Sequence, residues 1–536
     1  MEWTPASALR WFFSSEQGAS GRLIPRWIFL RALGLIYYSA FFSLLPQIRG
    51  LIGPQGILPA NEYLQALAER FGHAAYWYAP TVLWLSSSSR MLTAICWIGM
   101  IASVLLVLNL WPRGMLAICF VCFLSFVSAA QDFSAYQSDG MLLEASFISL
   151  FFAPAGFRPG WGEESRPSCA SLFLLVWEGF RIYFESGVAK IMGGDPQWRN
   201  FTALDEYYQN GPLPTWIGWH MQQQLPHWFH AATAFGTLAL ELGLAWMMFL
   251  PRRLRILCFL ILTPWQIGII LSANYTFLNY LVLALGILLL DDQCVLPFLP
   301  RFWKKSYLAT KEAKPLAAPA AEEKWRRRLG EQISALKIAL TAVMLTWIFY
   351  ATLAQMVWMV RPWPLPTTPV SALEPFRIAN RYGLFAVMTR GRYEVEFQGS
   401  DDGETWLIYP FRYKPQDPSK PPGIYAPYQP RFDWNLWFAS LSSWRQEPIV
   451  PRTEQGLLRG DNDVLLLFAG NPFPHAPPRQ VRAVIWQYWF TTPAEKRAHG
   501  LWWRREQLGL YAPTLEREDD GRIVVLQWPQ ATEPRE

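Results

Sequence analysis

The sequence predicts an α-helical polytopic membrane domain followed by a mainly β, sandwich-like extracytoplasmic domain. Long apolar runs recur up to residue 360, and beyond it the pattern changes to short alternating segments separated by turn residues. Only 16% of the 536 residues are charged, against about 25% in soluble domains, and the mean hydropathy is positive, at +0.11. This composition excludes a disordered chain, a fibrous repeat and a protein that coats nucleic acid.

The apolar runs are long enough to cross a bilayer. A hydrocarbon core about 30 Å thick needs about 20 apolar helical residues. The fourth run is short enough to be re-entrant, and Pro264 is expected to kink the seventh. We therefore predict about nine spans, at Trp27–Leu45, Met91–Leu110, Gly114–Ala130, Asp139–Pro154, Ala170–Met192, Trp228–Leu250, Leu254–Leu271, Ala273–Leu290 and Ile333–Val360.

The basic residues between these runs predict the orientation. The loops 1–26, 111–113, 155–169, 251–255 and 291–332 hold 18 Lys and Arg residues, and the opposite loops 46–90, 131–140 and 193–227 hold 4. Loops rich in Lys and Arg stay in the cytoplasm. We therefore expect a cytoplasmic N-terminus and, after an odd number of spans, an extracytoplasmic C-terminal domain.

Four regions follow from these boundaries: a transmembrane helical domain at 1–292, a basic cytoplasmic linker at 293–332, a last transmembrane helix at 333–360 and the mainly β domain at 361–536. Within the linker, residues 308–324 are rich in Ala, Pro and charge, which is typical of a flexible segment. We interpret the basic run Trp325–Arg328 as a contact to lipid headgroups rather than to nucleic acid.

The C-terminal region shows the signature of strands and turns. Its expected strands are Tyr393–Gln398, Thr405–Tyr413, Val464–Phe468, Val481–Phe490 and Ile523–Trp528, with one helix at Asn435–Trp444. No cysteine follows Cys294, so this domain must hold its core by packing, chiefly of aromatic side chains.

Charged residues inside the apolar runs are candidate functional groups, because charges in hydrocarbon are expensive. Glu178, Arg181 and Glu185 are spaced to share one helical face, and Lys190 can reach the interface. Glu144 and Glu241 lie in other spans. Proton chemistry is one interpretation, but no His–Glu or Cys–His pair accompanies them, so we favour a structural ion-pair lattice. The sequence indicates no metal site and no cofactor.

Several distinctive stretches are spread over nearly the whole chain: Arg31–Ala60, SDGMLLEASFISLFFAP at Ser138–Pro154, Glu185–His230, and in the last region FRIANRYGLFAVMTRGRYEVEFQGSDDGETW, FRYKPQDPSKPPGIYAPYQPRFDWNLWFA, NPFPHAPPRQVRAVIWQYWFTT and LWWRR. Together these stretches resemble the lipase maturation factor family. The sequence departs from the family pattern at Gln209, Asn210 and Gly211. The membrane half is similar, more distantly, to the membrane domain of vitamin K-dependent carboxylases. Animal members of the resembled family reside in the endoplasmic reticulum, where their terminal domain faces the lumen and they help secreted lipases to fold and assemble.

The resemblance implies a chaperone-like maturation factor in a bilayer, with exported client proteins such as lipases as partners and no nucleic acid. A bacterial inner membrane is the expected location, or the endoplasmic reticulum in a eukaryotic host. The expected client-contact residues are Trp434, Trp437, Trp444, Tyr425 and Tyr428. The alternative is an intramembrane enzyme that modifies a lipid or lipid-borne substrate through Glu144, Glu178, Arg181, Glu185, Lys190 or Glu241. A transporter is a third possibility, without a visible inverted repeat to support it.

Overall fold

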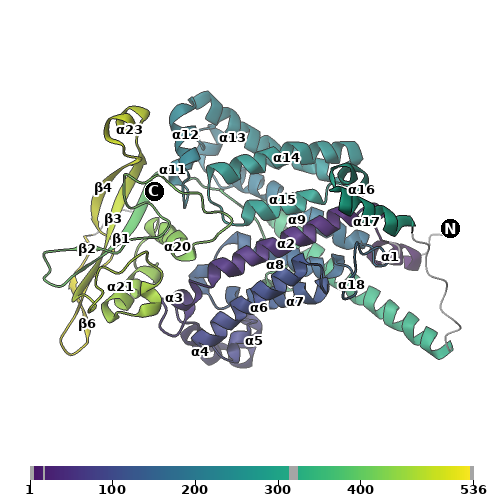
Figure 1. Ribbon diagram of the computed structural model, residues 1–536, viewed down its shortest axis with the longest axis horizontal. Helices are drawn as coiled ribbons and strands as arrows, with labels where there is room; N and C mark the ends of the chain where they lie inside the picture. Colours follow the sequence, from purple (N-terminus) through teal and green to yellow (C-terminus); the bar gives the residue numbers. More distant parts are fainter. Residues whose placement is uncertain (1–4, 16–17, 313–323, 531–536) are drawn as a thin grey trace.

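The structure, a computed structural model, describes residues 5–15, 18–312 and 324–530. Helices form one end of the molecule, and a sheet with its own helices forms the other (Figure 1). The helices before the sheet are α1 (Pro5–Phe13), α2 (Leu23–Leu44), α3 (Ile48–Ile52), α4 (Ala60–Phe71), α5 (Ala75–Tyr78), α6 (Ser89–Val107), α7 (Pro112–Val127), α8 (Gln137–Phe152), α9 (Cys169–Met192), α10 (Pro196–Arg199), α11 (Tyr207–Asn210), α12 (Trp216–Gln224), α13 (His227–Leu242), α14 (Arg252–Ser272), α15 (Leu278–Ile287), α16 (Asp292–Val295), α17 (Arg301–Glu312), α18 (Lys324–Val360) and α19 (Thr368–Ser371). Short 3₁₀ helices lie between them at η1 (Gly72–Ala74), η2 (Val82–Trp84), η3 (Gln131–Ser134), η4 (Leu244–Phe249), η5 (Leu296–Phe298) and η6 (Glu374–Phe376).

Helices occupy the predicted spans, with one marked exception. In Ala273–Leu290 the helix α15 begins only at Leu278, and the residues before it are not helical. Within the described residues, five helices are long and apolar enough to cross a membrane, or six if α15 and the segment Asp292–Phe298, bent by 105°, form one broken span. The five are Leu23–Leu44, Ser89–Val107, His227–Phe249, Arg252–Ser272 and Gln332–Val360. The nine crossings therefore stay a prediction.

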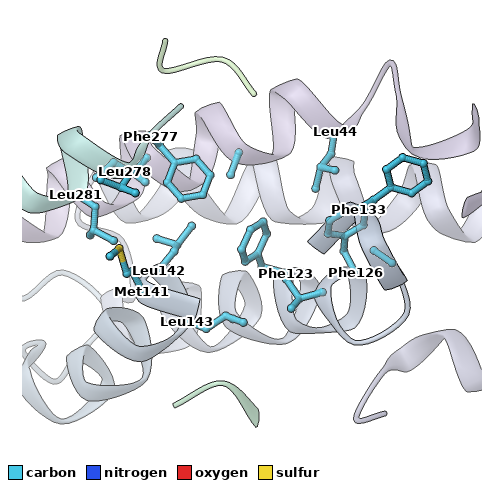
Figure 2. Packing of buried hydrophobic residues seen from close by; sticks show 14 of the residues in the cluster. Leu44, Phe123, Phe126, Phe133, Met141, Leu142, Leu143, Phe277, Leu278 and Leu281 are labelled. Atoms are coloured by element: carbon cyan, nitrogen blue, oxygen red, sulfur yellow. The ribbon is translucent and has the colours of Figure 1, made fainter. Parts of the chain in front are cut away.

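Within the helical end, α2 packs against α6 and α15. Figure 2 shows side chains from α7, α8 and the start of α15 converging on one core, with the rings of Phe123 and Phe277 6.4 Å apart. The cluster of buried apolar residues continues without a break to Val395 and Phe397 in the sheet. The two ends of the molecule therefore share one hydrophobic core.

The sheet is single and antiparallel. Its order is β2-β1-β3-β5-β6, and β4 pairs with the C-terminal part of β3 while β5 pairs with the N-terminal part. The strands are β1 (Arg392–Ser400), β2 (Leu407–Ile408), β3 (Gln480–Phe490), β4 (Trp503–Leu510), β5 (Thr514–Arg517) and β6 (Ile523–Gln527). Its helices are α20 (Arg431–Ser440), α21 (Ile449–Arg459), α22 (Asn462–Leu465) and α23 (Pro493–His499). The predicted sandwich is wrong for the described residues, because α20 packs on β1 and α21 on β3 where a second sheet was expected.

One expected strand is also corrected. The expected strand Val464–Phe468 begins inside α22 and continues as a turn. Its buried residues Val464, Leu467 and Phe468 have the i, i+3, i+4 spacing of a helical surface. The expected flexible segment 308–324 begins within α17 and reaches the first residue of α18. Its residues 313–323 lie outside the described residues, so its flexibility stays a prediction.

Candidate functional site

Charged side chains of α8 and α9 meet in the interior of the helical end. Arg181 forms an ion pair with Glu144 of α8, and both side chains are fully buried. On its own helix, Arg181 lies 3.8 Å from Glu185, one turn further along. Glu178 is fully buried beside them but makes no hydrogen bond of standard geometry to the described residues. The spacing therefore predicted the Arg181–Glu185 pair, whereas the partner on α8 required the tertiary fold.

Residues 378–389, which we call the strap, lead from η6 into β1 and lie against this charge cluster. The backbone N–H of Asn380 donates to Glu144 Oε2 (2.8 Å), and that of Tyr382 donates to Glu185 Oε2 (2.7 Å). Arg181 Nη1 donates to the carbonyl oxygen of Asn380 (2.6 Å). The Tyr382 hydroxyl adds a bond to Glu144 Oε2 (3.0 Å). Glu144, Arg181 and Glu185 thus bind the main chain of the strap through charge-assisted hydrogen bonds, which are among the stronger hydrogen bonds in proteins.

A second ion pair holds the middle of the strap. Lys190 Nζ donates to both carboxylate oxygens of Glu241 on α13, at 2.8 and 2.9 Å, and to the carbonyl oxygen of Leu384 at 2.9 Å. The side chain of Lys190 is only 2% exposed, so it is buried against Glu241 and the strap. Ser186 Oγ accepts the N–H of Leu384 (3.2 Å). Lys190 therefore binds the main chain of the strap, as Arg181 does.

The last part of the strap is fixed by the segment that follows α9. The indole of Trp198 donates to the carbonyl oxygen of Phe385 (2.9 Å), and Asp195 Oδ2 accepts the N–H of Met388 (2.7 Å). Asn210 Nδ2 donates to the carbonyl oxygen of Thr389 (2.9 Å). Polar side chains from the helical end therefore bind the strap main chain at successive points along its length.

A further buried ion pair joins the two ends of the molecule. Arg431, the first residue of α20, binds Asp139 of α8 through two bonds of 2.7 and 2.8 Å. The same guanidinium donates to the carbonyl oxygen of Phe133 (2.7 Å) and lies 4.7 Å from the ring of Phe126. This pair was not predicted from the sequence. The available signal was an acidic residue at the start of an apolar run with no basic residue nearby in sequence.

The loop before α20 is held by side chains of the helical end. Asn274 Nδ2 donates to the carbonyl oxygen of Gly423 (2.9 Å), and its Oδ1 accepts the N–H of Tyr425 (2.7 Å). Gln47 Nε2 donates to the carbonyl oxygen of Gln429 (3.0 Å). Asn274 interrupts what was predicted to be a continuous span, and this contact gives the reason for the break.

The loop at Gln209, Asn210 and Gly211, which departs from the family pattern, also contacts the sheet. Arg392 of β1 donates to the carbonyl oxygens of Gln209 (2.9 Å) and Pro212 (3.1 Å), and it pairs with Glu394. Gln209 Oε1 in turn accepts the N–H of Phe490 in β3 (3.0 Å). Because Arg392 donates to main-chain oxygens, its hydrogen bonds to this loop do not depend on the identity of the loop's side chains.

Two of the five predicted client-contact residues are buried inside the molecule, and three are half-buried. Trp434 and Trp437 are each 7% exposed and therefore form no open surface. Tyr425 and Tyr428 are half-buried in the loop bound by Asn274 and Gln47, and Trp444 is half-buried as well. Phe438, on the same helix as the two indoles, is 44% exposed.

Burial also raises the pKa of two carboxyl groups in the domain that contains the sheet. Asp433 of α20 is fully buried, and this raises the pKa of its carboxyl to about 6, although the backbone N–H groups of Lys414 and Tyr413 partly offset the shift. Burial alone also raises the pKa of Glu454 in α21 well above its usual value. Among the described residues, no group of three or more His, Cys, Asp or Glu side chains could hold a metal ion.

Comparison with known proteins identifies both ends of the chain. Residues 24–297 match the family model of the lipase maturation factor transmembrane domain, and residues 378–513 match that of the lipase maturation factor C-terminal domain. The second match begins at the strap. The chain is 31% identical to lipase maturation factor 1 of Bos taurus, over 94% of this chain and 91% of that protein. It is 31% identical to lipase maturation factor 2 of Gallus gallus (92% and 82%) and 30% identical to lipase maturation factor 2 of Homo sapiens (93% and 84%). No solved structure matches. The chain therefore belongs to the lipase maturation factor family, and its several apolar helices agree with a multi-pass membrane protein.

Proposed function

We propose that this protein is a membrane-resident maturation factor that helps exported proteins, including lipases, to fold and assemble, and that it catalyses no covalent reaction. The names of its relatives support the maturation role. The contacts of the buried charged side chains support the proposal that the protein is not an enzyme. Glu144, Arg181 and Glu185 each bind the strap, and such groups are committed to structure rather than to proton transfer with a substrate.

The proposed orientation has a cytoplasmic N-terminus and places the sheet outside the cytoplasm. The excess of Lys and Arg in one set of loops supports it. In a bacterium the membrane would be the inner membrane, and in a eukaryote that of the endoplasmic reticulum. Either location brings the sheet to the compartment where newly translocated proteins fold.

We place the client contact at one edge of the sheet, on β6. Within the described residues β6 pairs only with β5, and Val525 and Leu526 are 40% and 53% exposed. Trp528 follows at 60% exposure, with its ring 6.0 Å from that of Trp444. An exposed apolar edge strand is a template for another extended segment. Folding intermediates present such segments.

A site-specific crosslink tests this contact in the full chain. A photoreactive amino acid in place of Leu526 should crosslink exported proteins in the native host, whereas the same residue in place of Leu466, which is 55% exposed and off the sheet edge, should not. L526K should lower the secreted lipase activity at an unchanged level of the factor, because a lysine protects an edge against pairing. Equal crosslinking from both positions would exclude β6 as the contact.

A second candidate, an intramembrane enzyme acting on a lipid, rests on Glu178. This buried carboxyl makes no hydrogen bond of standard geometry to the described residues, and buried ionisable groups with perturbed environments gather at functional sites. The E178Q variant decides between the two functions. Loss of function with a normal protein level and a normal melting temperature would favour the enzyme. Unchanged function supports the assembly factor.

A further inference from the structure

A cavity of about 600 Å³ lies among α9, α13, α14 and α15. α13 packs against α9, and α14 packs against α15, so the cavity fills the space that separates α13 from α14. Its walls are mostly apolar and aromatic, and the strap closes one side with Leu384 and Phe385. This size and character are typical of sites for small hydrophobic molecules.

The cavity opens onto the apolar outer surface of α14. Ile261 and Leu271 line it, yet they are 37% and 46% exposed. The neighbouring surface is apolar as well, with Leu260 58% and Ile267 44% exposed. α13 together with η4 (His227–Phe249) and α14 (Arg252–Ser272) are each long and apolar enough to span a bilayer, and in a bilayer lipid chains would surround this opening. An acyl chain can enter sideways without leaving hydrocarbon.

Polar groups gather on the inner wall without adding net charge. Lys190 and Glu241 line the cavity and neutralise each other. Deeper in the wall, Tyr183 accepts a hydrogen bond from Gln266 Nε2 (2.8 Å), which leaves its own hydroxyl hydrogen for another acceptor. An ester carbonyl fits that position. A free carboxylate does not, because no unpaired cation in the described wall would compensate it.

We propose that this cavity binds one acyl chain of an uncharged or zwitterionic membrane lipid, with an ester oxygen next to the Tyr183 hydroxyl. The occupied site would fill the space between α13 and the strap, and it would make the junction of the two ends of the molecule sensitive to bound lipid. A peptide is a poor occupant, because its main chain would need hydrogen-bond partners that an apolar wall does not supply.

Gly268 offers a way to fill the cavity without disturbing the fold. It lines the cavity, and a Cβ built on it meets no atom within 4 Å. G268F should therefore occupy the space of the chain. The matched control is I267F. Ile267 directly precedes Gly268 on the same helix, is exposed and does not line the cavity.

The test uses the full protein reconstituted in phosphatidylcholine vesicles that contain a phosphatidylcholine with a photoreactive acyl chain. Labelling of the wall residues Trp265 and Phe229 should fall at least fivefold in G268F and stay unchanged in I267F, at equal melting temperatures of the two variants. If G268F fails to fold, G268L replaces it. A photoreactive fatty acid should label the wall at least fivefold less than the phosphatidylcholine does.

Three results would overturn the proposal. The first is equal labelling of the wall in G268F and in the unmodified protein. The second is label confined to lipid-facing positions such as Ile267. The third is stronger labelling by the fatty acid, which would contradict the preference for a ligand without net charge.

Discussion

Arg181 and Glu144 come from neighbouring helices and form a completely buried ion pair, and both also bind the residue Asn380 from a distant part of the chain. The pair therefore joins three segments and not two. Its charges are compensated partly by main-chain dipoles of the strap. This arrangement explains why α8 and α9 contain charged residues although they are otherwise apolar: the charges bind the main chain of the strap.

The first prediction concerns the loss of this pair. R181M should lower the free energy of unfolding by about 3–5 kcal/mol, because it leaves Glu144 and Glu185 buried without their cation. The measurement is the denaturant midpoint of the detergent-solubilised protein. R452M is the control, since Arg452 and Glu62 pair at 3.2 Å with side chains 45% and 55% exposed, and such pairs contribute below about 1 kcal/mol. Equal effects of the two variants would contradict the structural role of Arg181.

The second prediction concerns Asp139 and Arg431. D139N and R431Q should each release the loop before α20, and the double variant should be no worse than the more severe single one, because both remove the same contact. The readout is the rate of limited proteolysis within residues 414–430. Effects of the two substitutions that simply add would show that the residues act independently.

The third prediction is a pH dependence that arises from Asp433. Its pKa is about 6 in the folded protein, against about 4 in an unfolded chain. Between these values the folded state binds more protons than the unfolded state, so this residue makes stability fall as pH rises from about 4 to 6, by at most about 3 kcal/mol.

D433N removes this contribution, because an amide does not titrate. The difference in melting temperature between the unmodified protein and D433N should therefore change across pH 4 to 6.5 and level off above it. A difference that is constant with pH would contradict the raised pKa. Comparison of the two proteins cancels the titration of Glu454, which both retain.

The fourth prediction concerns orientation. A cysteine introduced by S443C, at an exposed position, should react with a membrane-impermeant maleimide in intact spheroplasts. One introduced by K305C, also exposed, should react only after permeabilisation. The unmodified protein gives the background from its six free cysteines. Protection of S443C together with reaction of K305C would reverse the proposed topology.

The helices were predictable because apolar periodicity and length are local properties of the sequence. The break before α15 was not, because Asn274 differs from a tolerated polar residue in a span only through its bonds to Gly423 and Tyr425. The charged residues of α8 and α9 that bind the strap were found as charges in apolar runs. Their partners were not found, because most are main-chain atoms, which are the same in every sequence.

The sheet was predicted less well than the helices. β1 and β3 are buried strands with strong β-formers, and both were expected close to their observed ends. β4 reads WRREQLGL, and its many exposed charged and polar positions hide it from a search for apolar alternation. The helices α20 and α21 replace the expected second sheet, and that choice depends on which apolar faces meet in the folded molecule.

The strap makes the membrane half dependent on residues that are synthesised after it. A chain that stops after α18 would keep four buried charged side chains, Glu144, Arg181, Glu185 and Lys190, but would lack Asn380, Tyr382 and Leu384, which hydrogen-bond to them. Such a truncated product would keep the ion pairs Glu144–Arg181 and Lys190–Glu241 but would lack their hydrogen bonds to the strap main chain. The buried charges of the membrane half therefore gain these bonds only in a chain that includes the strap.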